Sequence, residues 1–123
     1  MRIRVKWSSG ELECTLRDTD TARSVFAALP VTARASTWGE EVYFDLPVHA
    51  ELEPDCQQVV DRGTVCYWVQ GGAMALPYGP TPVSQGKECR LVTAVNLLGQ
   101  FDGDSRKLAT VRAGEEITVE RVE

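Results

Sequence analysis

The sequence has few of the residues from which catalytic and metal sites are commonly built. Its 123 residues include one histidine, His49, and the four cysteines have neither the spacing of a zinc knuckle nor that of a redox CxxC pair. Basic residues are fewer than acidic ones, 13 against 18, and the net charge is -5. This balance argues against nucleic acid or an anionic membrane as a partner.

Long apolar runs are also missing, since no stretch approaches the roughly 20 apolar residues that a membrane helix needs. Charges interrupt the apolar positions of the first six residues, so they do not resemble a signal peptide. We therefore expect a cytoplasmic protein. In that compartment Cys14, Cys56, Cys66 and Cys89 are expected to be buried or half-buried free thiols.

Alternation of apolar and polar residues dominates the chain. Ile3, Val5 and Trp7 alternate with charged residues, and the same pattern resumes after a Ser-Ser-Gly turn, which predicts a hairpin over residues 3–16. The segment 18–21 offers helix-capping side chains, and an apolar stripe at helical spacing then runs to Pro30. Further strands are predicted near residues 31–35, 42–46, 64–69, 73–78, 92–101 (broken at Gly99) and 117–122.

The remaining segments are predicted to be irregular. Residues 48–61 are polar and are expected to cross the surface, and residues 103–114 could form a short helical turn. About eight strands with frequent turns indicate one mainly β domain over residues 1–123, a closed eight-stranded barrel with one packed α-helix. Because a barrel of this size is filled by its own side chains, its function is expected on the outer wall and the loops.

Four sequence blocks occur in an order that resembles a known group. They are Trp38–Phe44, Gly63–Trp68, Gly79–Ser84 and Val95–Gly99. Together they resemble the small prokaryotic cyclophilin-like family of uncharacterised proteins, over nearly the whole chain. The resemblance implies an eight-stranded cyclophilin-like β-barrel with a helix packed at its end, and it implies no established activity.

True cyclophilins are prolyl isomerases that use an arginine beside a hydrophobic proline pocket. The strand that takes the place of the arginine-bearing strand, residues 42–48, contains Asp45 and no arginine. Residues 88–96, which take the place of the segment that supplies a tryptophan and a histidine, contain neither. We therefore assign no catalytic residue. A divergent isomerase remains an alternative, with Arg34 or Arg90 supplying the missing donor.

A set of aromatic residues is the leading candidate for a binding site. Alternation places Tyr43 and Trp68 on the outside of the barrel, near Tyr78, Thr81 and a loop stiffened by Pro80. We expect these four residues to hold a small molecule or a short extended peptide, in a non-catalytic binding module. In the alternative interpretation the segment 48–61 covers the aromatic face, or a second subunit does so in a structural homo-oligomer.

Other residues with aromatic, titratable or acidic side chains are expected to have structural or solvent-exposed positions. Trp38, next to a glycine, is expected to plug one end of a hairpin, and His49 is expected on the surface because no nucleophile is paired with it. Glu51, Glu53 and Asp55 lack the glycine turn of a calcium loop and are interpreted as a solvated acidic segment. We expect neither a metal nor a cofactor.

Overall fold

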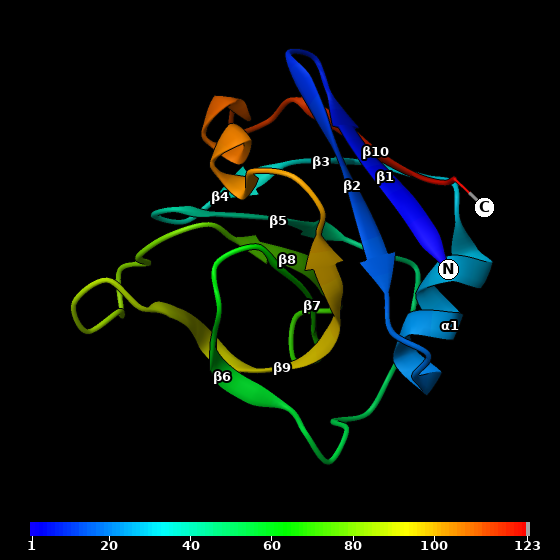
Figure 1. The fold of residues 1–123 in the computed structure, drawn as a ribbon, viewed down its shortest axis with the longest axis horizontal. Helices are drawn as coiled ribbons and strands as arrows, with labels where there is room; N and C mark the ends of the chain where they lie inside the picture. Colours follow the sequence, from blue (N-terminus) through cyan, green and yellow to red (C-terminus); the bar gives the residue numbers. More distant parts are fainter. Residues whose placement is uncertain (123) are drawn as a thin grey trace.

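The computed structural model describes residues 1–122 and shows a strongly curved sheet that nearly closes into a barrel (Figure 1). Its elements are, in order, β1 (Arg2–Trp7), β2 (Gly10–Leu16), α1 (Asp20–Ala28), β3 (Val31–Arg34), β4 (Ser36–Thr37), β5 (Glu41–Asp45), β6 (Gln57–Val60), β7 (Thr64–Trp68), β8 (Ala73–Pro77), β9 (Cys89–Phe101), the 3-10 helix η1 (Ser105–Thr110) and β10 (Glu116–Arg121). Neither helical segment within residues 1–122 has the length and apolar character needed to cross a bilayer.

The strands follow the order β3-β10-β1-β2-β9-β7-β8-β5-β4. The two ends of this path, β3 and β4, are separated in the chain by Ala35 alone, so the sheet returns to its starting point. The eight predicted strands are all present. The structure adds the two-residue β4, and it also adds β6, which pairs with β9 outside the main path.

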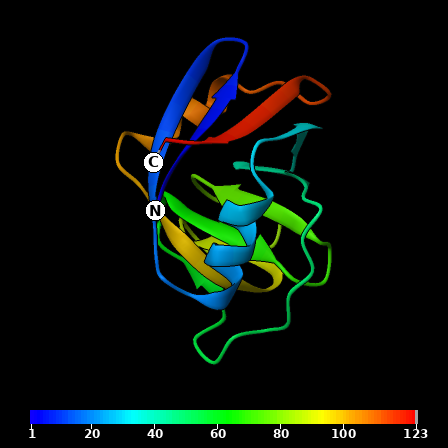
Figure 2. The same cartoon turned by 90° about the vertical axis from the view of Figure 1, so that its right-hand side faces the viewer.

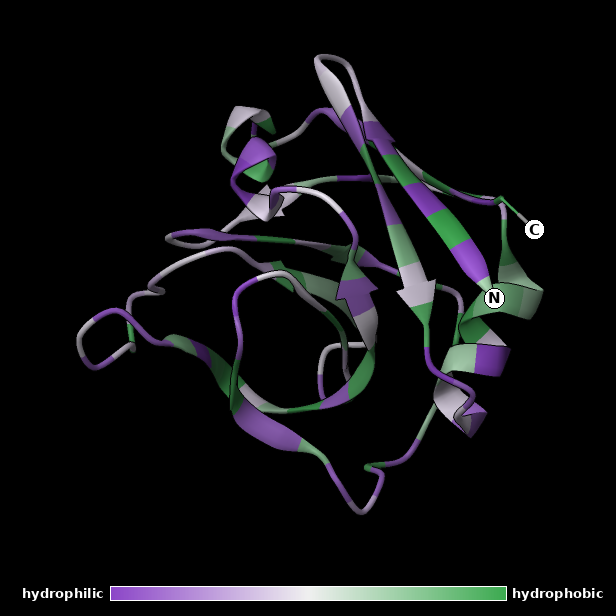
Figure 3. Ribbon diagram, in the orientation of Figure 1, coloured by the Kyte–Doolittle hydropathy of each residue, from purple (hydrophilic) through white to green (hydrophobic). Residues whose placement is uncertain are grey.

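The first and last strands close the barrel against each other. β1 pairs antiparallel with β10 in a register that sets Val5 opposite Val119, and on its other edge it pairs with β2. Alternation is visible along β1 as a change between hydrophobic and hydrophilic colours (Figure 3). Ile3 and Val5 are fully buried, whereas Lys6 is exposed. Pairing of the two strands removes what would otherwise be open sheet edges.

Helix α1 lies across one end of the barrel (Figure 2). Its start is fixed by Thr19, whose side chain accepts a hydrogen bond from the Ala22 backbone N–H. Ala22 and Val25 face the barrel and are completely buried, and they join the main core. The helix ends before Pro30, which cannot continue it.

Side chains fill the barrel interior, as the alternation predicted. The largest of the fully buried ones include Tyr67, Phe44, Ile3, Met74 and Leu76. A second, smaller cluster lies outside this core and consists of Val60, Cys66, Ala75, Cys89, Leu91 and Val95. Because it joins residues of β6 and β9 to outward-facing residues of β7 and β8, the first half of β9 packs over the outer wall.

The cysteines are free, as predicted: three are buried, and Cys56 is half-buried. The predicted break of the strand at Gly99 is wrong, because β9 runs through this residue to Phe101. The pairing of β9 with β7 shifts by one residue there, which marks a β-bulge. A Cβ atom at Gly99 would lie 2.2 Å from the Thr15 carbonyl oxygen, so the glycine allows β2 to approach closely.

Candidate functional site

The outer wall of the barrel carries a small aromatic pocket. Its cavity of about 230 Å³ is lined by Trp38, Glu41, Tyr43, Trp68, Leu91 and Val92, and this set is called the aromatic pocket below. The lining residues come from β5, β7, β9 and the turn before β5. On β5, Val42 and Phe44 point into the barrel core, so the alternate residues Glu41 and Tyr43 face outward.

Three contacts hold the Trp68 ring in place. It meets Tyr43 edge-on, with ring centroids 6.3 Å apart and an interplanar angle of 86°. Its indole Nε1 donates a hydrogen bond of 2.6 Å to the Thr93 hydroxyl of β9. The ring also lies against Gly71, where a Cβ would approach it to 2.1 Å. The Gly-Gly turn after β7 therefore makes room for one wall of the pocket.

The proline-braced loop supports the opposite wall. The backbone N–H of Glu40 donates to the Pro80 carbonyl at 2.9 Å, and the Tyr78 N–H donates to the Glu40 carbonyl at 2.8 Å. Gly39 adopts a φ of +60° and fits closely against this loop. Because proline fixes the backbone of the loop, it gives the turn that carries Trp38 and Glu41 a stiff support.

Glu41 is an unusual residue for such a position. Only 5% of it is exposed, and its Oε1 atom is buried with no hydrogen-bond partner within residues 1–122. Burial raises the pKa of the Glu41 carboxyl from 4.5 to about 7, because desolvation disfavours the charged form. A buried polar group without a partner is destabilising unless something else satisfies it.

Thiols are the titratable groups that adjoin Glu41 from other strands. Burial is the main reason why the pKa values of Cys66 on β7 and Cys89 on β9 are raised, and proximity to Glu41 adds to both shifts. Both thiols are therefore neutral at pH 7. β8 places Pro77 opposite Glu41 and contributes no titratable side chain there.

Of the four residues predicted to form a site, two line the aromatic pocket and two lie outside it. Tyr43 and Trp68 lie together in the aromatic pocket. Tyr78 does not line the pocket and packs against the main core. Thr81 also lies outside it, because its buried hydroxyl donates to the Arg90 carbonyl and so ties the proline loop to the start of β9.

The sequence-based reasoning missed Trp38, Glu41, Leu91 and Val92 as pocket residues. Trp38 was expected to plug a hairpin end, but it is half-buried and forms part of the pocket wall. Alternation along β5 could have indicated Glu41, because it shares the outward face with Tyr43. No sequence pattern shows that Leu91 and Val92 fold over this face.

The remaining candidate groups lie away from the aromatic pocket. His49 is 93% exposed at its side chain, which agrees with the predicted surface position. Arg34 donates to the Gly114 carbonyl, and Arg90 forms an ion pair with Glu88. Neither arginine lines the pocket. Within the described residues no group of three or more His, Cys, Asp or Glu is placed to hold a metal ion.

The acidic segment is less solvated than its sequence predicts. One Glu53 carboxylate oxygen, Oε2, accepts hydrogen bonds from the backbone N–H and the hydroxyl of Thr21, at 3.1 and 2.9 Å. Asp55 forms an ion pair of 2.8 Å with Arg17. These two acids therefore attach the segment to the start of α1 and the end of β2, whereas Glu51 is exposed.

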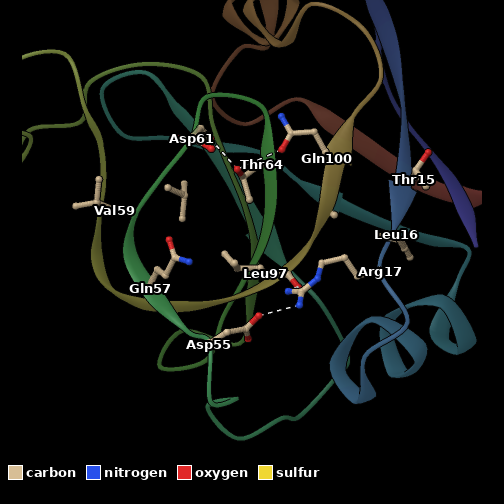
Figure 4. Close-up of a pocket in the computed structure, with 12 residues that line it drawn as sticks. Thr15, Leu16, Arg17, Asp55, Gln57, Val59, Asp61, Thr64, Leu97 and Gln100 are labelled. Carbon is tan, nitrogen blue, oxygen red and sulfur yellow. Dashed lines mark hydrogen bonds and ion pairs between the residues drawn. The ribbon is translucent and has the colours of Figure 1, made fainter.

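A second, larger cavity of about 550 Å³ lies between β2, β6 and β9, and Figure 4 shows its lining. β2 and β6 both pair with the edge of β9 that β7 leaves free, and the gap between them opens this groove. Arg17 bridges the gap: it pairs with Asp55 and also donates to the Leu97 carbonyl at 3.1 Å.

The polar side chains of this groove largely have partners within the protein. The Thr64 hydroxyl donates to the Asp61 carbonyl at 2.8 Å (Figure 4). The Gln100 amide donates to the Arg62 carbonyl at 3.2 Å. Among the described residues that line the groove, no buried side-chain nitrogen or oxygen atom lacks a partner, in contrast to Glu41 of the aromatic pocket. On this ground the aromatic pocket is the stronger candidate site.

Comparisons with known proteins agree with the barrel architecture. A family model described as "Cyclophilin-like" matches residues 1–120. The solution structure of the hypothetical protein AF2241 from Archaeoglobus fulgidus is 37% identical, with a TM-score of 0.85 over 99% of this chain and 95% of that one. The structure of McbB in complex with tryptophan is 13% identical, with a TM-score of 0.66 over 98% of this chain and 44% of that one, a likeness of fold alone. The search of curated proteins gave no match.

Proposed function

The chain belongs to the cyclophilin-like family, and we propose that it is a binding module that holds a small organic molecule in the aromatic pocket. The observation that carries this proposal is the combination of a cavity, three aromatic rings and a buried carboxylate oxygen that has no hydrogen-bond partner within residues 1–122. Ligand sites are typically concave, mostly apolar and supplied with a few converging polar groups. The aromatic pocket has this composition.

The size of the cavity favours a small molecule over an extended peptide. Drug-sized ligands occupy roughly 300–1,000 Å³. The aromatic pocket, at about 230 Å³, is below this range and suits a compound with a single ring. Because the pocket walls are held by the Thr93 hydrogen bond and the proline loop, we expect the pocket to be largely preformed.

A fragment screen with a blocking variant tests the proposal. Single-ring compounds would be screened by thermal shift and by quenching of tryptophan fluorescence. Val92 is 46% exposed at the pocket, so Val92→Phe should occupy the cavity with little effect on folding. Hits should bind the wild type and should bind the Val92→Phe variant at least about tenfold more weakly, which corresponds to 1.4 kcal/mol.

Val83→Phe provides the matched control, because Val83 is similarly exposed (43%) and does not line the aromatic pocket. It should bind the same compounds as the wild type. If no compound binds, or if every hit binds Val92→Phe as well as the wild type, the proposal is wrong.

The two other hypotheses have separate tests. A divergent prolyl isomerase would accelerate isomerisation of a proline peptide above the background rate. A homo-oligomer would cover the aromatic pocket with a second copy, and light scattering would then report a mass above the 13.6 kDa of one chain. No contact among the described residues specifically favours either of these over ligand binding.

A further inference from the structure

We propose that the ligand of the aromatic pocket is a small organic ammonium ion, whose N–H group donates a hydrogen bond to the Glu41 carboxylate while its hydrocarbon part lies against the aromatic rings. This inference rests on the proposed function and specifies the chemical class of the ligand. Two independent features of the pocket support it, the unsatisfied acceptor and the aromatic lining.

The unpartnered acceptor favours an occupant with a donor group. Oε1 of Glu41 is buried and has no partner within residues 1–122, and an apolar ligand would leave it in that state while removing further water from the pocket. An ammonium group would supply both a donor and a compensating positive charge. Hydrogen bonds between ionised groups are stronger than those between neutral ones, and they strengthen further in a dry site.

The pocket wall favours a cation for a second reason. Trp38, Tyr43 and Trp68 present aromatic rings around the same cavity. A cation within about 6 Å of a ring face is attracted by the negative potential of that face, most strongly at tryptophan. Within residues 1–122 no lysine or arginine lines the cavity, so no described side chain of the pocket already provides this charge.

The charge state of Glu41 makes binding dependent on pH. The pKa of its carboxyl is raised to about 7, so the carboxylate form that pairs with an ammonium ion is the minor form at pH 6 and the major form at pH 8. Among its titratable neighbours, Cys66 and Cys89 remain neutral over this interval because burial raises their pKa values. Glu40 precedes Glu41 in the chain and is exposed.

Benzylamine and the similar-sized neutral compound benzyl alcohol are the probes, with binding followed by tryptophan fluorescence between pH 6 and pH 8. Since the fraction of ionised Glu41 rises about tenfold over this range, the affinity for benzylamine should rise by about the same factor. The affinity for benzyl alcohol should not rise. Glu41→Gln should weaken benzylamine binding at pH 8 at least about tenfold and remove its pH dependence, with little change for benzyl alcohol.

Glu40→Gln is the matched control, since it makes the same change in net charge at the neighbouring exposed position. It should bind benzylamine as the wild type does. If benzylamine binds no better than benzyl alcohol and Glu41→Gln has no effect, the ammonium inference is wrong while the pocket remains a binding site. If neither these probes nor any other compound binds in a manner sensitive to Val92→Phe, the inference and the proposed function both fail.

Discussion

At the scale of single residues, burial of the Glu41 carboxyl has an energetic cost. Glu41 is 95% buried, and its Oε1 atom has no hydrogen-bond partner within residues 1–122, so the carboxyl loses the solvation that its charged form has in the unfolded chain. Another oxygen acceptor beside the pocket, the Thr93 hydroxyl, is satisfied because it accepts the indole N–H of Trp68. Folding stability alone would therefore favour a hydrophobic residue at position 41 unless the acid has a role in binding.

We predict that Glu41 makes the protein less stable as pH rises. Because the pKa of its carboxyl is about 7 in the folded state and near 4.5 when unfolded, the folded protein holds the extra proton between these values. The contribution of Glu41 to the free energy of unfolding is fully present below pH 4.5. It is lost as pH rises through 7, and the loss amounts to up to about 3 kcal/mol.

Urea unfolding of the wild type and Glu41→Gln at pH 5 and pH 8 measures this effect. The variant should gain stability relative to the wild type at pH 8. The quantity to compare is the difference in unfolding free energy between the two proteins. Acids such as Glu13 and Asp104, which are present in both, have lowered pKa values and affect stability in the opposite direction at lower pH. An equal change in unfolding free energy between pH 5 and pH 8 in both proteins would contradict the prediction.

At the scale of elements, β9 organises the molecule. It is 13 residues long, pairs with β2, β6 and β7, and carries Leu91 and Val92 to the aromatic pocket. A buried polar residue, Asn96, fixes its middle. The Asn96 amide donates to the Thr21 hydroxyl and the Glu51 carbonyl and accepts from the Glu53 N–H, at 3.0, 2.8 and 2.8 Å. Strand, helix and acidic segment are thereby joined.

We predict that Asn96→Ala destabilises the fold by about 3 kcal/mol, because the change leaves several buried partners without hydrogen bonds. Equilibrium unfolding in urea provides the measurement. Gln100→Ala, an exposed change on the same strand, should cost less than about 1 kcal/mol. Equal losses in the two variants would show that the Asn96 network does not contribute as described.

Some elements could be predicted from local patterns and others could not. The hairpin, the helix α1 with a cap within residues 18–21, and the strands at 42–46 and 64–69 are predictable because their periodicity and turn residues are local features. β6 was missed because Gln57 and Gln58 are exposed and polar, and the segment becomes a strand only by pairing with β9. Strand pairing of this kind depends on a partner distant in the sequence.

At the scale of the whole molecule, curvature of the sheet into a barrel separates an inner core from an outer wall. The inner faces of the strands share one core, while a second cluster and the aromatic pocket occupy the outer wall. Strand β10 is central to closure because it joins β1 to β3. Along it Ile117 and Val119 are fully buried, and Thr118 between them is half-exposed.

We predict that Val119→Asp and Thr118→Asp have very different effects. Val119 packs in the interior, so a charge there is buried without a partner and should cost more than about 4 kcal/mol or prevent folding. Thr118 points outward and lies opposite Lys6, so Thr118→Asp should cost less than about 1 kcal/mol. Thermal melts and near-UV circular dichroism would report both. Similar losses at the two positions would contradict a closed, filled barrel.

The amino-acid sequence alone determined which residues of the eight predicted strands face the core, because side-chain direction follows from period-two alternation. It also determined the hairpin turns and the helix cap, which depend on neighbouring residues. Tertiary structure decided which outward residues meet: Trp38, Glu41, Tyr43 and Trp68 share one cavity, while Tyr78 and Thr81 lie elsewhere. The reason is that alternation assigns a face to each residue, whereas neighbours on that face depend on strand order, register and the path of β9 over the wall.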